Sequence, residues 1–321
     1  MNKDLSTPLK ETNTEEIVPN LRVKNTLNLL ILAIAVIALA FSPIFTKLSE
    51  FELSPTTIIF NRLWIATIIV SFWQFVSTFR GIDSIESPPS NYKERGLLIL
   101  ASFSATVSAL LWAISFTQTS IASSTVLRSL TPLFIALGAW LILKQRFDRK
   151  FILGMVLAII GGISIGWDDL QLGTNYLQGD AIALLSAALH GVNLLAVGYL
   201  RDRGCTTDRV LLWRCGAGAL MVMPVVYFTD LPLFPVSAEG WLSVIALAVV
   251  CQTFGQGLLV FSLKQFSSSF VGIFALLKPI VTALLAWVIF AEDISLTSSI
   301  ALGLILTGIY LAKSSDSKAQ Q

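Results

Sequence analysis

Charge is scarce in this chain of 321 residues, of which only 13% are Asp, Glu, Lys or Arg while 55% are hydrophobic. A soluble domain usually carries about 25% charged residues, so lipid must replace water over much of the surface. A membrane-spanning helix needs about 20 mainly apolar residues. Ten segments meet that description, at residues 25–46, 55–78, 97–117, 119–143, 151–167, 180–200, 208–228, 240–261, 268–291 and 295–313. The sequence therefore predicts an all-α integral membrane protein with ten transmembrane helices.

Sequence motifs typical of catalytic sites are absent as well. The chain has one histidine, His190, and no H-E-x-x-H, G-x-S-x-G or Walker A sequence. Its three cysteines, Cys205, Cys215 and Cys251, lack C-x-x-C spacing and are expected to be free thiols. These absences predict that the protein is not an enzyme, has no metal site or cofactor, and is not driven by ATP. The expected partners are a small-molecule solute and the lipid bilayer, with no nucleic acid.

Basic residues gather on one side of the predicted membrane. Besides the N-terminal tail, the cytoplasmic gaps would hold Arg80, Lys93, Arg95, Lys144, Arg146, Arg149, Lys150, Arg201, Arg203 and Lys264. The opposite side has Lys47 alone, together with the acidic residues Asp168, Asp169, Asp230, Glu239, Glu292 and Asp293. This asymmetry predicts that both termini are cytoplasmic. Residues 1–24 mix four basic with four acidic residues and are expected to be a disordered cytoplasmic tail, and 314–321 a second tail. The expected location is the inner (cytoplasmic) membrane.

One membrane segment occurs twice. At an offset of 147 residues, Leu130–Leu143 matches Leu277–Phe290 with seven identities in fourteen positions, Pro132 and Pro279 among them. The match predicts two repeats, residues 25–167 and 180–313, each with five spans. Because five is odd, the second repeat must be inverted in the membrane. Duplicated, inverted halves are typical of transporters that work by alternating access around a shared site.

Several short motifs carry a family resemblance. They are Ser54-Pro55 followed by Arg62, Ala122–Leu127 leading to Pro132, and Val271–Pro279 ending at Glu292. With the repeat and the span count, they make the chain resemble the drug/metabolite transporter superfamily, in particular its EamA-type ten-helix permeases. The resemblance covers about residues 25–313 and implies transport, but not a particular solute. The chain departs from the family at Gln145, at residues 40–43, at Thr131 and at Lys278.

Charged residues inside predicted spans are the first candidates for a binding site, because each costs about 2.5–3.5 kcal/mol to insert. Lys278 lies near the middle of its span and precedes Pro279, where a proline would interrupt the helix and free backbone carbonyls. Arg128 and Thr131 are expected on one face of the matching helix, before Pro132. Since these helices are repeat mates, Arg128 and Lys278 could face one central site and favour an anion. Both could instead be structural.

Polar residues also form stripes at helical spacing. One stripe pairs His190 with Asn193 and another Gln252 with Gln256. A third consists of Ser104, Ser108, Trp112 and Ser115. The stripes could line a wet cavity or form hydrogen bonds that hold helices together. Taken together, the stripes favour the cavity. Arg62 and Arg214 follow Ser54 and Thr206 at equal spacing, and are expected to snorkel to the membrane interface or to bond a neighbouring carbonyl, and not to contact the solute.

Three functions remain open. The broad resemblance favours a secondary transporter that exports or exchanges a small metabolite, such as an amino acid or an amphipathic compound. Arg128 and Lys278 favour an exchanger of anionic or phosphorylated metabolites. A non-transporting membrane sensor or assembly protein is the third. His190 could couple transport to protons, but no Asp or Glu lies near the middle of a span, so diffusion or exchange is at least as well supported.

Overall fold

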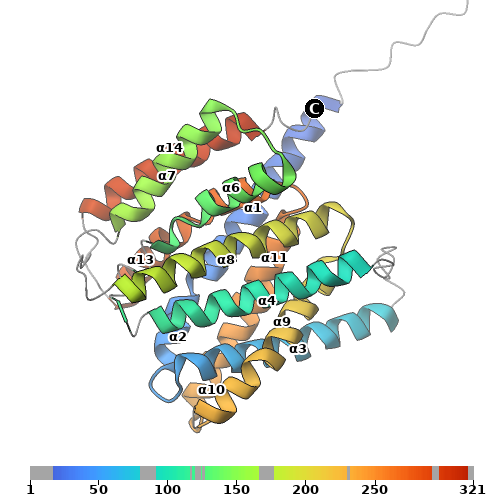
Figure 1. Ribbon diagram of the computed structural model, residues 1–321, viewed down its shortest axis with the longest axis vertical. Coiled ribbons are helices and arrows are strands. Elements are labelled where there is room, and N and C mark those ends of the chain that lie inside the picture. Colours follow the sequence, from blue (N-terminus) through green and yellow to red (C-terminus); the bar gives the residue numbers. More distant parts are fainter. Residues whose placement is uncertain are drawn as a thin grey trace, which may run out of the picture.

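A computed structural model describes residues 17–79, 92–115, 118–119, 124, 127–165, 177–229, 232–290 and 296–316. All regular structure in these ranges is helical. The helices are α1 (Ile17–Ala40), α2 (Ser42–Ser49), α3 (Pro55–Phe79), α4 (Tyr92–Ser115), α6 (Thr131–Leu143), α7 (Arg149–Ile165), α8 (Leu177–Asp202), α9 (Thr207–Thr229), α10 (Ala238–Ala246), η2 (Leu247–Gly255), α11 (Gln256–Ser262), α12 (Ser268–Phe274), α13 (Leu277–Phe290) and α14 (Leu296–Asp316). Figure 1 shows them packed as one bundle.

Six helical stretches in the described part of the chain are long and apolar enough to cross a membrane. They are Thr26–Ser49, Pro55–Ser77, Tyr92–Ser115, Leu177–Asp202, Thr207–Phe228 and Ala238–Ser262. The shorter apolar helices Thr131–Leu143 and Ser268–Thr282 accompany them. Large apolar side chains such as Ile142, Phe228 and Val288 are more than 70% exposed, as expected of a lipid-facing surface. The chain is therefore an all-helical membrane protein.

Two predicted spans, 119–143 and 268–291, are interrupted shortly before Pro132 and Pro279, the prolines at which the sequence predicts a helix break. In the first, residues 127–128 are helical, residues 129–130 form a turn in which the Leu130 N–H donates to the Leu127 carbonyl (3.1 Å), and α6 begins at Thr131. In the second, α12 ends at Phe274 and α13 begins at Leu277. Pro132 and Pro279 therefore lie in the first turn of a new helix, where the missing N–H costs nothing.

The eighth predicted span contains an unexpected π-helix, η2. Thr253 shows the altered winding, because its hydroxyl donates to the carbonyl of Ala248, five residues earlier (2.9 Å). A π-segment of nine residues is uncommon, and such segments are frequent at functional sites. It carries Cys251 and Gln252, both buried, into the interior of the bundle.

Glycines bring α7 and α14 into close antiparallel contact. A Cβ atom on Gly161 would lie 2.8 Å from the Ala301 carbonyl oxygen and 2.8 Å from Ile305 Cγ1. A Cβ on Gly308 would lie 2.8 Å from Ala158 Cβ. The offset of 147 relates Gly161 to Gly308 and Ala158 to Ile305, so each contact is the image of the other. The helices run beside each other in Figure 1, and this reciprocal antiparallel packing is what a two-fold relation between repeats requires.

Other helix pairs obey the same exchange of repeats. In the first such pair, α4 packs on α8. The corresponding helices of the other repeats, η2 with α11 and α1, also pack on each other. The contact of α6 with α8 corresponds to that of α13 with α1. The contact of α3 with η2 corresponds to that of α9 with α4. The mates α3 and α9 also contact each other directly. Each repeat therefore buries much of its surface against the other, and the centre of the bundle lies between them.

At one end of the bundle, a carboxylate joins the two repeats. Glu52, between α2 and α3, accepts hydrogen bonds from the backbone N–H of Val236 (2.8 Å) and from the N–H and hydroxyl of Ser237. Ser237 in turn caps α10 by accepting from the Gly240 N–H (2.9 Å). These hydrogen bonds, led by that of the Ser237 hydroxyl, hold the pKa of Glu52 below its usual range.

We expect Glu52→Gln to lower the melting temperature near neutral pH and to have no effect in acid. Because the pKa of Glu52 is lower in the folded protein, its contribution to stability is present above the unfolded pKa and is lost as pH falls through the folded value. Thermal unfolding of both proteins in detergent, from neutral pH to below about pH 4, measures the difference. A constant difference across that range would contradict this role, and Glu50→Gln, a neighbouring exposed carboxylate, is the control.

Candidate functional site: a cationic cluster between the repeats

Four cationic side chains from both repeats lie within electrostatic range of one another. Lys278 on α13 interacts electrostatically with Arg128, which precedes α6, and with Arg62 on α3. Arg214 on α9 interacts with Arg62. His190 on α8 lies beside this cationic cluster and interacts with Arg128, Arg214 and Lys278. The structure therefore brings together Arg128 and Lys278, the pair that the repeat symmetry places on opposite halves.

Arg128 is held in place by neutral groups. Its guanidinium donates to the hydroxyls of Ser108 on α4 (3.3 Å) and Ser186 on α8, and lies 4.6 Å from the ring centroid of Trp112. The two serines also bond each other's helices, since each hydroxyl donates to the partner's carbonyl at 2.8 Å. None of these groups carries negative charge. They fix the direction of the guanidinium and leave its charge uncompensated.

Thr131 positions Arg128 from the other side. Its side chain is buried, and its hydroxyl donates to the Arg128 carbonyl (2.7 Å). A two-residue turn separates the two positions, because Arg128 is the last residue of a helical segment and Thr131 is the first residue of α6. Thr131 thus acts on the backbone that carries Arg128.

Lys278 lies at the start of α13, not in the middle of a long helix. Its backbone N–H donates to the Ala275 carbonyl (3.0 Å) across the break between α12 and α13. The side chain is half-buried. Its ammonium has no hydrogen-bond partner within the ranges that the structure describes, and it interacts electrostatically with Arg128, Arg62 and Cys251. A cation in this state is available to an anion that enters the bundle.

For Arg214 the structure shows a bond inside the protein, the second of the two expectations, and not snorkelling to the interface. Arg214 is only 7% exposed, and its guanidinium donates to the Gln256 side-chain oxygen (3.4 Å). The Nε atoms of both arginines are buried and have no hydrogen-bond partner among the described residues. A buried cationic donor without a partner is costly, which is a sign that a further group can occupy the space beside it.

The predicted polar stripes divide between two roles. Asn193 holds two helices together, because its buried amide on α8 donates to the Ala101 carbonyl on α4 (2.8 Å). Ser104 and Ser115 also bond neighbouring backbone or serine groups. Gln256 and Ser108, by contrast, hold the arginines of the cluster. Gln252 is buried and donates to Cys215 Sγ (3.4 Å). Trp140 is 57% exposed on the lipid-facing side, and the side chain of its mate Trp287 lies outside the described residues.

Carboxylates are kept away from the cluster. Among the residues that the structure describes, every Asp and Glu lies in a loop or in the first or last turn of a helix. The cysteines nearest the cluster, Cys215 and Cys251, are buried, free thiols. Four cations therefore converge between the repeats with no internal counter-charge in this part of the chain. Such an arrangement suits a ligand that brings negative charge with it.

The fold and this interior polar site define a helical membrane transporter. A sequence profile described as the EamA-like transporter family matches residues 26–167 and again 177–313. The chain therefore belongs to the EamA-like transporter family, with two copies of its repeat. An uncharacterized transporter of Archaeoglobus fulgidus is 22% identical over 286 residues, covering 88% of this chain and 96% of that protein. A protein known from a crystal structure shares the fold, with a TM-score of 0.78 at 17% identity over 92% of this chain and 99% of that one.

Proposed function

We propose that the protein is a secondary transporter that carries a small organic anion, such as a phosphorylated or carboxylated metabolite, by alternating access. The observation that carries this proposal is the convergence of Arg62, Arg128, Arg214 and Lys278 without a carboxylate among the described neighbours. Like charges held close together in a region of low dielectric repel strongly. A bound anion offsets that repulsion, and the empty site lacks this compensation.

Exchange follows from the same electrostatics. Moving the site from one side of the membrane to the other means carrying its charge through the least polar part of the protein. With an anion bound, the net charge falls and the movement costs less. We therefore infer that the loaded carrier reorients faster than the empty one, so that the protein exchanges anions across the membrane.

The proposed topology has ten membrane crossings, two inverted repeats and both termini in the cytoplasm, with the chain in an inner membrane. Three observations support it. In Figure 1 the beginning of α1 and the end of α14 lie at the same end of the bundle, as an even number of crossings requires. The antiparallel packing of the mates α7 and α14 agrees with inversion in the membrane plane. The basic residues at that end favour a cytoplasmic side.

Export of an amino acid or an amphipathic compound is the second candidate. It is favoured by the ring of Trp112, which borders Arg128 and could stack on an apolar group of the solute. Such a solute would bind through one carboxylate and leave part of the positive charge unmatched. A sensor or assembly role, the third, has no observation in its favour beyond the membrane fold.

Counterflow in proteoliposomes separates these candidates. Vesicles preloaded with an unlabelled compound receive the labelled compound outside, with a panel of phosphorylated metabolites, dicarboxylates, neutral sugars and zwitterionic amino acids. The proposal predicts counterflow of di-anions and little net uptake into empty vesicles. Counterflow of amino acids with no response to di-anions would contradict anion specificity, and equal uptake into empty and loaded vesicles would contradict exchange.

A further inference from the structure

The guanidinium of Arg62 forms no hydrogen bond with any residue that the structure describes, and its Nε atom is buried. A guanidinium has five N–H donors, which need acceptors once they leave water. Arg62 interacts electrostatically with the thiols of Cys215 and Cys251 and with other cations of the cluster. None of these groups is a carboxylate. Arg62 therefore offers a full set of donors to an anion that enters the bundle.

Arg214 places a second guanidinium beside Arg62, from the other repeat. The two side chains interact electrostatically, and their helices, the repeat mates α3 and α9, pack directly on each other. Arg214 is only 7% exposed, and its Nε atom has no partner in the described part of the chain. One of its terminal nitrogens donates to the neutral side chain of Gln256 (3.4 Å), which orients the guanidinium and leaves its charge uncompensated. Arg62 and Arg214 together are called the arginine pair below.

Arg128 and Lys278 enter the cluster from a different side. The helix that carries Arg214, α9, packs mainly on α3 and α4, whereas the helix that carries Lys278, α13, packs mainly on α1 and α14. Arg62 interacts with Arg214 and also with Arg128 and Lys278, so it links the two sides. His190 on α8 interacts with cations of both sides. The positive charge is therefore spread over two regions of the interior, the arginine pair and the pair of Arg128 and Lys278.

We propose that the solute carries two separate anionic groups, one bound by the arginine pair and the other by Arg128 and Lys278. This inference rests on the proposed function, because it divides the same site into two subsites. A single carboxylate or phosphate bound at one pair would leave the buried donors of the other pair without an acceptor. A guanidinium pairs with either group through two parallel hydrogen bonds. The class of solute is therefore a short organic compound with an acidic group at each end.

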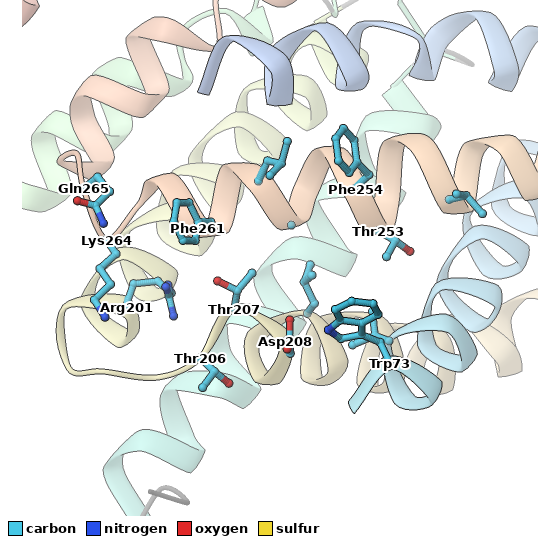
Figure 2. A pocket seen from close by; sticks show the side chains of 15 residues that line it. Trp73, Arg201, Thr206, Thr207, Asp208, Thr253, Phe254, Phe261, Lys264 and Gln265 are labelled. Atoms are coloured by element: carbon cyan, nitrogen blue, oxygen red, sulfur yellow. The ribbon is translucent and has the colours of Figure 1, made fainter. Parts of the chain in front are cut away.

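A groove on the side of the bundle is a separate place and supplies a control. It has a volume of about 700 Å³ and is lined by residues of α3, the start of α9, η2 and α11, but by none of the four cations. Figure 2 shows Lys264 at this groove, and its side chain is exposed. Lys264→Gln therefore removes one positive charge from the protein without altering the cationic cluster.

Isothermal titration of the full chain in nanodiscs tests the two subsites. The probes are malonate, succinate, glutarate and phosphonoacetate, each paired with the compound in which one carboxylate is replaced by a neutral amide. For the pair that binds most tightly, wild type should bind the anion with two acidic groups at least about tenfold more tightly than the amide. Arg214→Gln should abolish this difference and leave the affinity for the amide within about twofold of wild type, because the remaining acidic group binds at Arg128 and Lys278. Lys264→Gln should behave as wild type.

The same titrations separate this inference from the proposed function. Equal affinity for the anion and its amide, or an Arg214→Gln variant that weakens both to the same degree, would overturn the two subsites. Binding of the amide that is lost in Lys278→Ala would then still support a site for one anionic group. If no probe binds, the two subsites and the proposed anion site are both wrong.

A second variant keeps the test decisive if melting temperatures show that Arg214→Gln does not fold. Gln256→Leu removes the oxygen that accepts from Arg214 and keeps all four cations. Because the guanidinium is then no longer held in one direction, the tenfold difference should fall to about threefold. An unchanged difference in a folded Gln256→Leu variant would overturn the role of Arg214.

Discussion

Lys278→Ala is expected to reduce solute counterflow about a hundredfold. The Lys278 ammonium is half-buried between the repeats and has no hydrogen-bond partner in the described ranges, so a bound anion is the group that it can satisfy. A hydrogen bond to a charged group contributes about 1.5–3 kcal/mol, and about 3 kcal/mol corresponds to a hundredfold change in affinity. Initial rates in proteoliposomes measure the loss.

Three companion variants decide how the loss arises. Lys278→Arg keeps the charge and should retain a substantial part of the rate, whereas Lys313→Ala, which removes an exposed cation in the last turn of α14, should leave it unchanged. Arg128→Ala should reduce transport as severely as Lys278→Ala, since both cations face the same space. If Lys278→Ala and Arg128→Ala fold and transport at the wild-type rate, the cluster is structural and the solute binds elsewhere.

Gly308→Leu is expected to destabilise the protein by about 3 kcal/mol or more. A side chain at this position meets the backbone of Gly154 and Ala158 Cβ across the α7–α14 contact, and neither can move without separating the helices. Overpacking a tight contact typically costs about 1–3 kcal/mol, and a backbone clash lies at the upper end or beyond. Thermal unfolding in detergent, followed by size-exclusion chromatography, measures the loss of folded protein.

Repeat symmetry supplies a second test of the same contact. Gly161, the mate of Gly308, faces Ala301 in the image of that contact, so Gly161→Leu should destabilise the protein to a similar degree. Gly303 lies on the same helix as Gly308 with no heavy atom within 4 Å of its Cβ position, so Gly303→Leu is the control. Equal stability of Gly308→Leu and Gly303→Leu would contradict the close packing of α7 and α14.

Much of the fold follows from the sequence alone, because apolar runs of span length and a repeated proline segment are both local signals. The predicted spans are largely helical in the described residues, with turns at residues 129–130 and 275–276. The breaks before α6 and α13 are harder to predict, since Pro132 and Pro279 are compatible with a kinked helix as well as with a fresh start. The π-helix η2, which packs against α1 and α3, carries no signal in the sequence that we recognise.

The site is only partly predictable for a related reason. Lys278 and Arg128 are conspicuous as charges within apolar runs, but Arg62 and Arg214 lie close enough to helix ends to be taken for interfacial residues. Their equal spacing from Ser54 and Thr206 in the two repeats was the available signal that they act together. Nothing in the sequence singles out Ser186, since a serine in a membrane helix usually bonds its own backbone. Its contact with Arg128 depends on how α4 and α8 pack.

Direct binding to the purified protein in nanodiscs tests the central claim most simply. Isothermal titration would compare a di-anionic metabolite with its neutral amide or dephosphorylated analogue, on wild type and on Lys278→Ala. The cationic cluster predicts that wild type binds the di-anion at least about tenfold more tightly than the neutral analogue. It also predicts that Lys278→Ala loses most of that preference. Equal affinity for the charged and neutral compounds, unchanged in Lys278→Ala, would contradict an anion site between the repeats.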